Sequence, residues 1–280
     1  MKVPFYKCNS KGNSFIIIFS STKILPLTSH QIQNICNSTD NQKVDGLILL
    51  DISDNSNIAT MNYFNNDGSW ETFCLNGMIC CSLIIKDLYN DHTMNAITSN
   101  NRKYYYKTIE DSMVEVQLDN PVNLELNKLK AWTLSLSPTV EPIKIDDFDC
   151  NYINSGAKHI VIKSEDDKLF NDDLNLKKIL KKIRYNKLFL PDGVNVNIYR
   201  CKGHNAIQVK TYEKGIEAMM SSCSSGSYAC AYHYFHCYGK PLKIKIFNDG
   251  GTSEVVFKKE NEKNLFLSKG EIEYKGELDI

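Results

Sequence analysis

Two cysteines stand directly before stretches that have the pattern of a helix. Cys74 precedes an apolar run from Met78 to Leu88, and Cys223 precedes an aromatic-rich stretch from Tyr228 to Tyr238. The first N–H groups of a helix have no intrahelical partner, and the N-terminus of a helix carries a partial positive charge. Such a position lowers the pKa of a thiol and raises its thiolate fraction. We therefore expect two thiols that can take up or release a proton.

The residues after each cysteine fall in the first turn of the expected helix. Asn76-Gly77 follows Cys74, and Ser224-Ser225-Gly226 follows Cys223. Backbone N–H groups at a helix start can hold a carboxylate. A buried small side chain is what most free cysteines are, and one helix-start cysteine alone would favour that interpretation.

The two cysteines belong to matching halves of the chain, and this match favours a chemical role for them over a packing role. Gly12, Gly46 and Cys74 in the first half match Gly156, Gly193 and Cys223 in the second, at separations of 144, 147 and 149 residues. Separations that drift so little indicate a duplicated unit. Two such units facing each other would place the thiols on opposite sides of one cleft. That geometry could move a proton from one face of a carbon to the other.

Five motifs along the chain resemble those of the diaminopimelate epimerase family, amino-acid racemases that need no pyridoxal phosphate. They are Lys11-Gly12-Asn13-Ser14-Phe15, the block from Asn65 to Gly77, Phe189-Leu190-Pro191-Asp192-Gly193-Val194-Asn195-Val196-Asn197, Tyr212-Glu213-Lys214-Gly215 and Cys223-Ser224-Ser225-Gly226. The resemblance implies an α/β fold of two mirrored domains, each a rolled β-sheet around a central helix, with the active site in the cleft between them. Residues 1–118 with 265–280 would form the domain that carries Cys74, and residues 119–264 the domain that carries Cys223.

The resemblance also implies a role for each matched residue. One cysteine thiolate removes the Cα proton, and the other thiol returns a proton to the opposite face. The helix starts bind the substrate α-carboxylate, and Glu213, aided by Asn65, pairs with the α-ammonium group. Without the resemblance, Glu213 could be a surface strand residue, and Asn13 and Asn65 could be turn formers. The implied substrate-binding set is Asn13, Asn65, Leu75, Asn76, Gly77, Asn195, Glu213, Lys214, Ser224 and Ser225.

Several positions depart from the family pattern around the substrate side chain. Gly156-Ala157-Lys158-His159 stands where the family has Gly-Asn-Pro-His, and Lys214 replaces an arginine, which loses a bidentate fork for a carboxylate. Further departures are Met219 and Met220, in place of a glutamate and a threonine, and Leu75 and Ser224, in place of glycines. The expected substrate is therefore L,L-diaminopimelate or another polar amino acid such as histidine.

Two other functions remain open. An isomerase of the phenazine-biosynthesis type has the same fold but moves a proton without two cysteines, so the presence of both thiols argues against it. A non-catalytic thiol-binding or metal-binding paralogue would hold stoichiometric zinc and exchange no amino-acid proton. The remaining cysteines inside the helices, Cys80, Cys81, Cys230 and Cys237, are expected to serve packing, and Cys8, Cys36, Cys150 and Cys201 have no motif context.

Composition limits the partners. The 280 residues are 42% hydrophobic and 24% charged, with 33 basic and 33 acidic side chains, so the charge gives no reason to expect nucleic acid or an anionic membrane. No stretch approaches the ~20 apolar residues of a membrane span. The ten cysteines include no Cys-x-x-Cys, so we expect no metal. The family resemblance implies that no cofactor is needed. We also expect reduced thiols in the cytoplasm. The expected partner is a small amino acid, and whether the chain forms a homodimer stays open.

The secondary-structure pattern places these motifs. Strands are expected at 3–8, 14–19, 45–50, 57–64, within 98–122 and within 264–274, and helices at 29–36 and 172–183. Residues 119–150 are interpreted as the connection into the second half of the chain.

Overall fold

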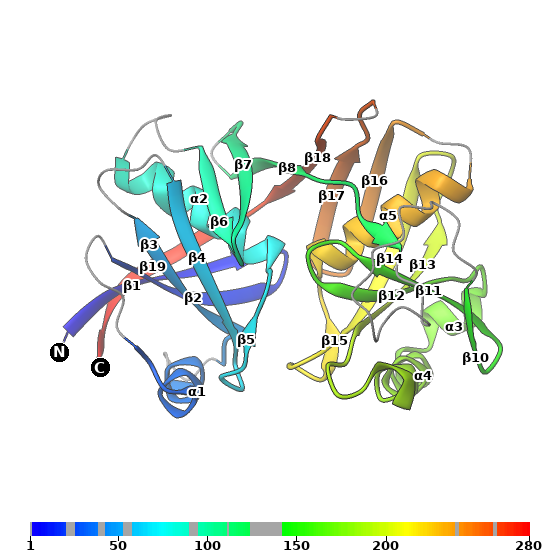
Figure 1. Ribbon diagram of the computed structural model, residues 1–280, viewed down its shortest axis with the longest axis horizontal. Helices are drawn as coiled ribbons and strands as arrows, with labels where there is room; N and C mark the ends of the chain where they lie inside the picture. The colour runs from blue at the N-terminus through cyan, green and yellow to red at the C-terminus, as the bar shows by residue number, and fades with distance from the viewer. Residues whose placement is uncertain are drawn as a thin grey trace. The chain divides into compact units, whose positions relative to one another are not determined.

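The computed structural model describes residues 2–20, 26–38, 43–52, 58–89, 95–110, 112–123, 142–238, 241–259 and 262–280. These residues form two compact units, each with its own strands and helices (Figure 1). Unit 1 comprises Met1–Leu118 and Leu265–Ile280, and unit 2 comprises Asp119–Asn264. No described helix has both the length and the apolar character that crossing a membrane requires.

Unit 1 is a mixed sheet in which the first and last strands of the chain are neighbours. Its strands are β1 (Lys2–Ser10), β2 (Asn13–Ser20), β3 (Gly46–Ile52), β4 (Ile58–Asn65), β5 (Trp70–Glu71), β6 (Ala96–Ser99), β7 (Arg102–Thr108), β8 (Met113–Leu118), β18 (Asn264–Lys269) and β19 (Glu271–Asp279). The β2–β3 and β4–β6 pairs are parallel, and the β1–β2, β3–β4, β6–β7 and β1–β19 pairs are antiparallel.

Helix α2 (Leu75–Tyr89) is the central helix of unit 1. It contacts β1, β2, β4, β7, β8 and β19, and the sheet curls around it (Figure 1). Every residue from Leu75 to Ile85 is buried, because the sequence is apolar on all sides of the helix. Helix α1 (Ser29–Ser38) instead has an apolar stripe of Ile32, Ile35 and Cys36, and packs with this stripe on β2 and β3.

Unit 2 repeats the strand pairings of unit 1. Its strands are β9 (Val122–Asn123), β10 (Ile143–Ile145), β11 (Phe148–Asn154), β12 (Lys158–Lys163), β13 (Asn195–Cys201), β14 (Ala206–Glu213), β15 (Ala218–Met220), β16 (Lys243–Asn248) and β17 (Gly251–Val256). The β12–β13 and β14–β16 pairs are parallel, and β11–β12, β13–β14, β14–β15 and β16–β17 are antiparallel. The expected duplication is therefore present in the topology.

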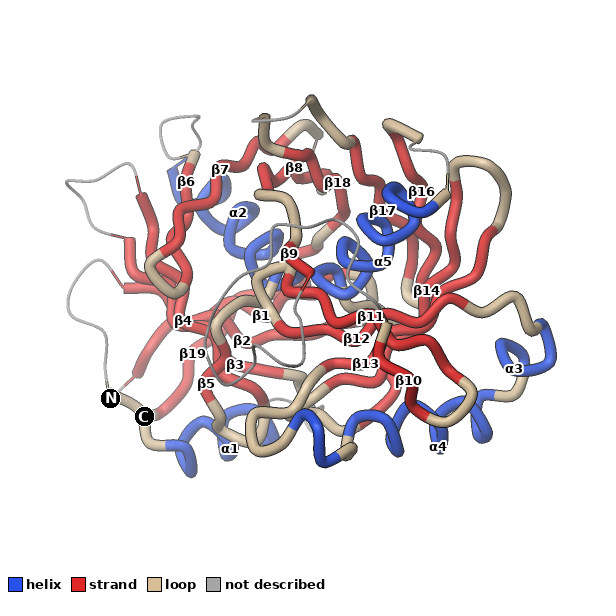
Figure 2. Tube along the Cα trace, turned by 45° about the vertical axis from the view of Figure 1, so that its right-hand side comes forward, coloured by secondary structure: helices blue, strands red, loops and turns tan. Residues whose placement is uncertain are grey.

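The helices of unit 2 divide in the same way into a central and an outer helix (Figure 2). Helix α5 (Ser224–Cys237) contacts β12, β13, β14, β16 and β17, as α2 contacts its own sheet. Helix α4 (Asp173–Arg184) packs on β13 and β14, following the short helix α3 (Asp167–Asn171). The 3₁₀ turn η2 (Lys187–Phe189) then leads toward β13.

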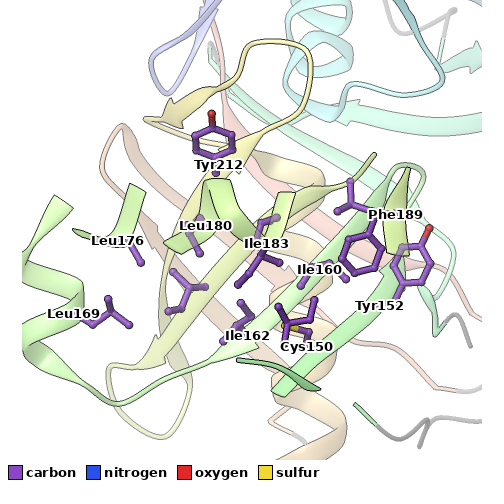
Figure 3. Packing of buried hydrophobic residues seen from close by; sticks show 14 of the residues in the cluster. Cys150, Tyr152, Ile160, Ile162, Leu169, Leu176, Leu180, Ile183, Phe189 and Tyr212 are labelled. Carbon is purple, nitrogen blue, oxygen red and sulfur yellow. The ribbon is translucent and has the colours of Figure 1, made fainter. Parts of the chain in front are cut away.

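A hydrophobic cluster of unit 2 lies between α4 and the sheet (Figure 3). Leu176, Leu180 and Ile183 share one helix face and are buried against strand residues that include Ile160 and Ile162. The lysines of the helix lie on its other faces, as its sequence predicts. Asp172 caps the start of α4 by accepting a hydrogen bond from the N–H of Asn175 at 3.0 Å.

Two expectations from the sequence need correction. Within residues 119–150, interpreted as a connection, residues 143–145 form β10 and residues 148–150 form the first part of β11. Residues 124–141 lie outside the described residues. The matched pair Gly46 and Gly193 is shifted, because Gly46 begins β3 whereas β13 begins at Asn195. The aspartates before the glycines, Asp45 and Asp192, do take equivalent places, as the contacts below show.

Candidate active site

Cys74 is the residue immediately before α2, and its sulfur serves as a cap of that helix. The side chain is 8% exposed, and the backbone N–H of Gly77 donates to Cys74 Sγ at 3.3 Å. A Cβ at position 77 would lie 2.5 Å from Ile48 Cδ1 and 3.4 Å from this sulfur, so glycine lets the helix start approach the thiol. One of the N–H groups that we expected to be available to a carboxylate is therefore directed at the sulfur.

Cys223 is the N-cap residue of α5, and its thiol is held protonated. Burial raises the pKa of Cys223, the carboxylate of Glu213 raises it further, and the N–H of Gly226 and the hydroxyl of Ser225 lower it. The prediction that a helix start lowers the thiol pKa is thus wrong for Cys223. The helix does act in that direction, but the loss of hydration of a buried thiolate and the negative charge of Glu213 are larger effects.

A chain of amides orients Asn13 and Asn76 in unit 1. Asn76 Nδ2 donates to Asn13 Oδ1 at 3.1 Å, and Asn13 Nδ2 donates to Asp45 Oδ2 at 2.8 Å. Asp45 Oδ2 also accepts from the N–H of Ser14 at 2.8 Å. All of this is local to the β1–β2 turn, the entry to β3 and the first turn of α2, so Asn13 and Asn76 are placed beside each other as the motifs suggested.

The equivalent place in unit 2 holds an ion pair. Lys158, which matches Ser14 of unit 1, places its Nζ 2.7 Å from Asp192 Oδ2. In unit 1 the N–H of Ser14 and the amide of Asn13 both donate to Asp45 Oδ2. The Asp192 carboxylate is mostly exposed, and its pKa is lowered by the hydrogen bond and the charge of Lys158. Ala157 and Lys158 both depart from the family pattern, and of these two residues Lys158 has an identified ion-pair partner, Asp192.

The segment after β14 carries Glu213 and Lys214. Asn195 Oδ1 accepts a hydrogen bond from the N–H of Lys214 at 2.9 Å, so the first residue of β13 fixes the end of β14. Asn65 occupies the last position of β4, and there its amide takes part in a turn. Tyr63 donates its hydroxyl to Asn65 Oδ1 at 2.9 Å, and Asn65 Nδ2 donates to Ser69 Oγ at 3.1 Å.

Leu75 and Ser224 are the first residues of the two central helices, and both are 1% exposed. Ser225 is 6% exposed, and its carbonyl accepts from Ser155 Oγ at 2.8 Å. The side chains of Leu75 and Ser224 are therefore buried at the two helix starts, where the first backbone N–H groups of a helix have no intrahelical partner.

Sequence reasoning missed a buried cluster beside Cys223. Its members are His159 on β12, Asn197 on β13, Thr211 on β14 and Ser225 on α5, connected by hydrogen bonds of 2.9–3.2 Å. A signal was present: Asn195 and Asn197 alternate with apolar residues in β13, so two amides occupy one face of a buried strand. His159 and Asn197 stood within quoted motifs without a role.

Most of the other cysteines lie in apolar surroundings. Burial raises the pKa values of Cys36 and Cys150 to about 12 and raises those of Cys80, Cys81 and Cys230 as well. Such thiols are unreactive and serve packing. Cys237 is the exposed member of the set, and within the described ranges no group of three His, Cys, Asp or Glu residues is arranged to hold a metal ion.

Comparison with known proteins places the chain among amino-acid epimerases. No protein-family model matches it. A diaminopimelate epimerase of Flavobacterium psychrophilum is 32% identical over 289 residues, which cover 99% of this chain and all of the relative. A diaminopimelate epimerase of Methanocella arvoryzae is 27% identical, with 100% and 98% of the two chains covered.

Solved structures share the fold at much lower identity. A hydroxyproline epimerase of Agrobacterium vitis has a TM-score of 0.66 at 10% identity, covering 99% of this chain and 92% of its own. A phenazine biosynthesis protein of Bacillus anthracis has a TM-score of 0.67 at 11% identity and covers both chains completely. With the paired helix-start cysteines and the full-length similarity at 32% identity, the chain belongs to the diaminopimelate epimerase family and is an isomerase of the racemase or epimerase type.

Proposed function

We propose that the protein inverts the Cα of an amino acid by two-base proton transfer between Cys74 and Cys223. The observation that carries this proposal is the repetition of one arrangement in both units. In each, a buried cysteine directly precedes the central helix, and the N–H of a glycine three residues later acts on its sulfur. The active site is proposed to form where the two units present these cysteines to one substrate.

The chemistry needs one thiolate and one thiol at the start of each turnover. The thiolate takes the Cα proton, so a Cα–H bond breaks and an S–H bond forms; the other thiol then gives its proton to the opposite face of Cα. Because burial and Glu213 favour the protonated form of Cys223, we assign Cys223 as the proton donor and Cys74 as the base in the resting protein. The reverse direction uses the opposite protonation states.

The substrate α-carboxylate opposes formation of a carbanion beside it, and the N–H groups at the two helix starts would offset that effect. Glu213 would pair with the α-ammonium group. Asn13 and Asn195 would contact the distal polar part of the substrate. The names of the relatives make L,L-diaminopimelate the first candidate substrate, and another polar amino acid such as histidine is the second.

Proton NMR in D2O tests the proposal. Reduced protein is incubated with L,L-diaminopimelate, L-histidine and a panel of other L-amino acids, and the loss of each α-proton signal is followed. Exchange of diaminopimelate alone would mean that the departures at Ala157 and Lys214 are tolerated. Exchange of a different amino acid would mean that the two-cysteine chemistry is present and that the substrate pocket has a different specificity. Failure of every amino acid to exchange, with both thiols titrating as free, would refute the epimerase proposal. A panel that includes substrates of the phenazine type would then test the related isomerase.

A further inference from the structure

Five hydrogen bonds lead from the buried strands to Cys223, and the direction of each follows from its partners. Asn197 Nδ2 lies 3.1 Å from the carbonyl oxygen of Ile160, which can only accept. Asn197 Oδ1 lies 2.9 Å from Thr211 Oγ1, which donates to it. A rotated amide would place two acceptors against each other at Ile160, so the orientation of Asn197 is fixed.

The amide in turn fixes the tautomer of His159. Asn197 Nδ2 carries a second hydrogen, and it lies 3.0 Å from His159 Nδ1, which must therefore be the unprotonated ring nitrogen. His159 has no exposed surface, and burial lowers its pKa to about 3, so the ring is neutral at physiological pH. A neutral ring with an acceptor at Nδ1 carries its hydrogen on Nε2.

The direction continues through Ser225. His159 Nε2 lies 3.2 Å from Ser225 Oγ, and Ser225 Oγ lies 3.6 Å from Cys223 Sγ. Since the histidine occupies one acceptor site of this hydroxyl, the Ser225 hydrogen is available for the sulfur. Polarisation by the first hydrogen bond strengthens the second. The carbonyl of Ser225, held by Ser155 at 2.8 Å, keeps the residue in place.

We propose that His159 and Asn197 are positioning residues that hold the Ser225 hydroxyl as a hydrogen-bond donor to the Cys223 sulfur. The relay acts in the half of the cycle in which Cys223 has given up its proton, when a donor stabilises the thiolate. In this respect the inference rests on the proposed two-cysteine function, although the relay itself is contained within unit 2. Among the described residues, Glu213 on β14 and Cys230 on α5 are the ionisable groups whose charges act with Cys223, and His159 reaches it through Ser225.

The test measures the reactivity of Cys223 without any substrate. The full-length protein is treated with methyl methanethiosulfonate over a range of pH, and mass spectrometry follows modification at Cys223. Ser225→Ala should raise the Cys223 pKa by about one unit, which lowers the thiolate fraction tenfold at a pH well below the pKa. A more basic thiolate is also more nucleophilic, so the rate should fall about three- to fourfold. Cys237, which is exposed, gives the internal reference rate.

Matched variants separate the relay from a general loss of packing. Ser227→Ala removes another buried hydroxyl from α5, one that donates to Asn248 at 3.2 Å, and should leave the Cys223 rate unchanged. Ser225→Thr retains the hydroxyl and should restore most of the rate. His159→Gln should slow the reaction in the parent protein but should add nothing in the Ser225→Ala background, because its effect passes through that hydroxyl.

Three results would overturn the proposal: an unchanged rate in Ser225→Ala, an equal loss in Ser227→Ala, or additive effects of His159→Gln and Ser225→Ala. If Ser225→Ala does not fold, the comparison of Ser225→Thr with His159→Gln decides by itself, because a relay predicts a loss in the histidine variant alone. The readout needs no turnover, so a protein that exchanges no amino-acid proton would still confirm or refute the relay.

Discussion

A Cβ at position 226 would lie 2.1 Å from Oδ1 of Asn197, closer than any real contact of this kind. Asn197 cannot move aside, because Thr211, His159 and Ile160 all bond its amide. The glycine in the first turn of α5 is therefore required by its neighbour and not by its backbone angles.

Gly226→Ala should destabilise the protein although alanine is the better helix former. The helical preference of alanine contributes about 1 kcal/mol, whereas the clash and the broken amide bonds cost at least ~2–4 kcal/mol. Urea unfolding measures the difference. Gly77→Ala is the matched comparison in α2. Its Cβ would meet the flexible end of Ile48 at 2.5 Å and would lie 3.4 Å from Cys74 Sγ, so the substitution should cost less. Equal losses in both variants would show that Asn197 is not the obstacle.

Cys74→Ala and Cys223→Ala should each abolish inversion of the substrate, with a loss of about 100- to 10,000-fold in kcat. Neither variant has both proton-transfer groups, so a mixture of the two should not recover activity if each molecule carries a complete site. Polarimetry or chiral chromatography follows the product. Alanine is preferred to serine because a hydroxyl could still carry a proton, and Cys237→Ala, at an exposed cysteine, is the control. Full activity in either active-site variant would refute the assignment.

Stability should fall in mild acid because of His159. Its pKa is lowered to about 3 by burial, while an unfolded histidine titrates near 6.5, so between these values the unfolded chain binds a proton that the folded chain does not. This contribution of His159 to stability is fully present above about pH 6.5 and is lost as the pH falls. The loss amounts to about 2 kcal/mol at pH 5. Urea midpoints at pH 7.5 and 5 measure it. Burial also lowers the pKa of His233 to about 4, so this residue adds a similar loss. His159→Gln should therefore remove about half of the pH dependence. His204→Gln, at an exposed histidine, should leave it unchanged.

Asp45→Ala should weaken substrate binding through Asn13. The carboxylate accepts from Asn13 Nδ2 and from the N–H of Ser14, each at 2.8 Å, so its loss frees the amide that is proposed to contact the substrate. The expected result is about a tenfold rise in KM with a smaller change in kcat. Asp51→Ala, near the other end of β3, is the control. A loss confined to kcat would place Asn13 in the chemical step instead.

The sequence was sufficient for the framework of the candidate site. The turn glycines Gly12 and Gly156 both have positive φ, 80° and 105°, so the repeat that they marked reflects the same local backbone in both units. The apolar run after Cys74 predicted a buried helix, and α2 begins at the next residue. These features depend on neighbours in the chain, which is why pattern and spacing revealed them.

Other features depend on contacts between residues far apart in sequence. Asn197 forms hydrogen bonds with residues that are 14 and 38 positions away in the sequence, on other strands. The residues next to Asn197 in the chain therefore give no indication of these partners. The thiol pKa of Cys223 was predicted with the wrong sign because burial and Glu213 are properties of the folded unit. The shift of Gly46 against Asn195 arises from two additional residues after Asp192, which motif matching aligned by glycine instead of by strand register.

The pairing of β1 with β19 sets an order on folding during synthesis. Lys2 lies opposite Asp279 and Asn9 opposite Glu271, so the sheet of unit 1 joins segments separated by almost the whole chain. Residues 119–264, which form unit 2, leave the ribosome before β19 does and hold all the strands of that unit's own sheet. Unit 2 can therefore complete its fold first. Until β19 is synthesised, the edge of β1 that pairs with β19 stays unpaired and exposed to other nascent chains. Unit 1, whose first strands are synthesised first, is therefore the unit that completes its fold last.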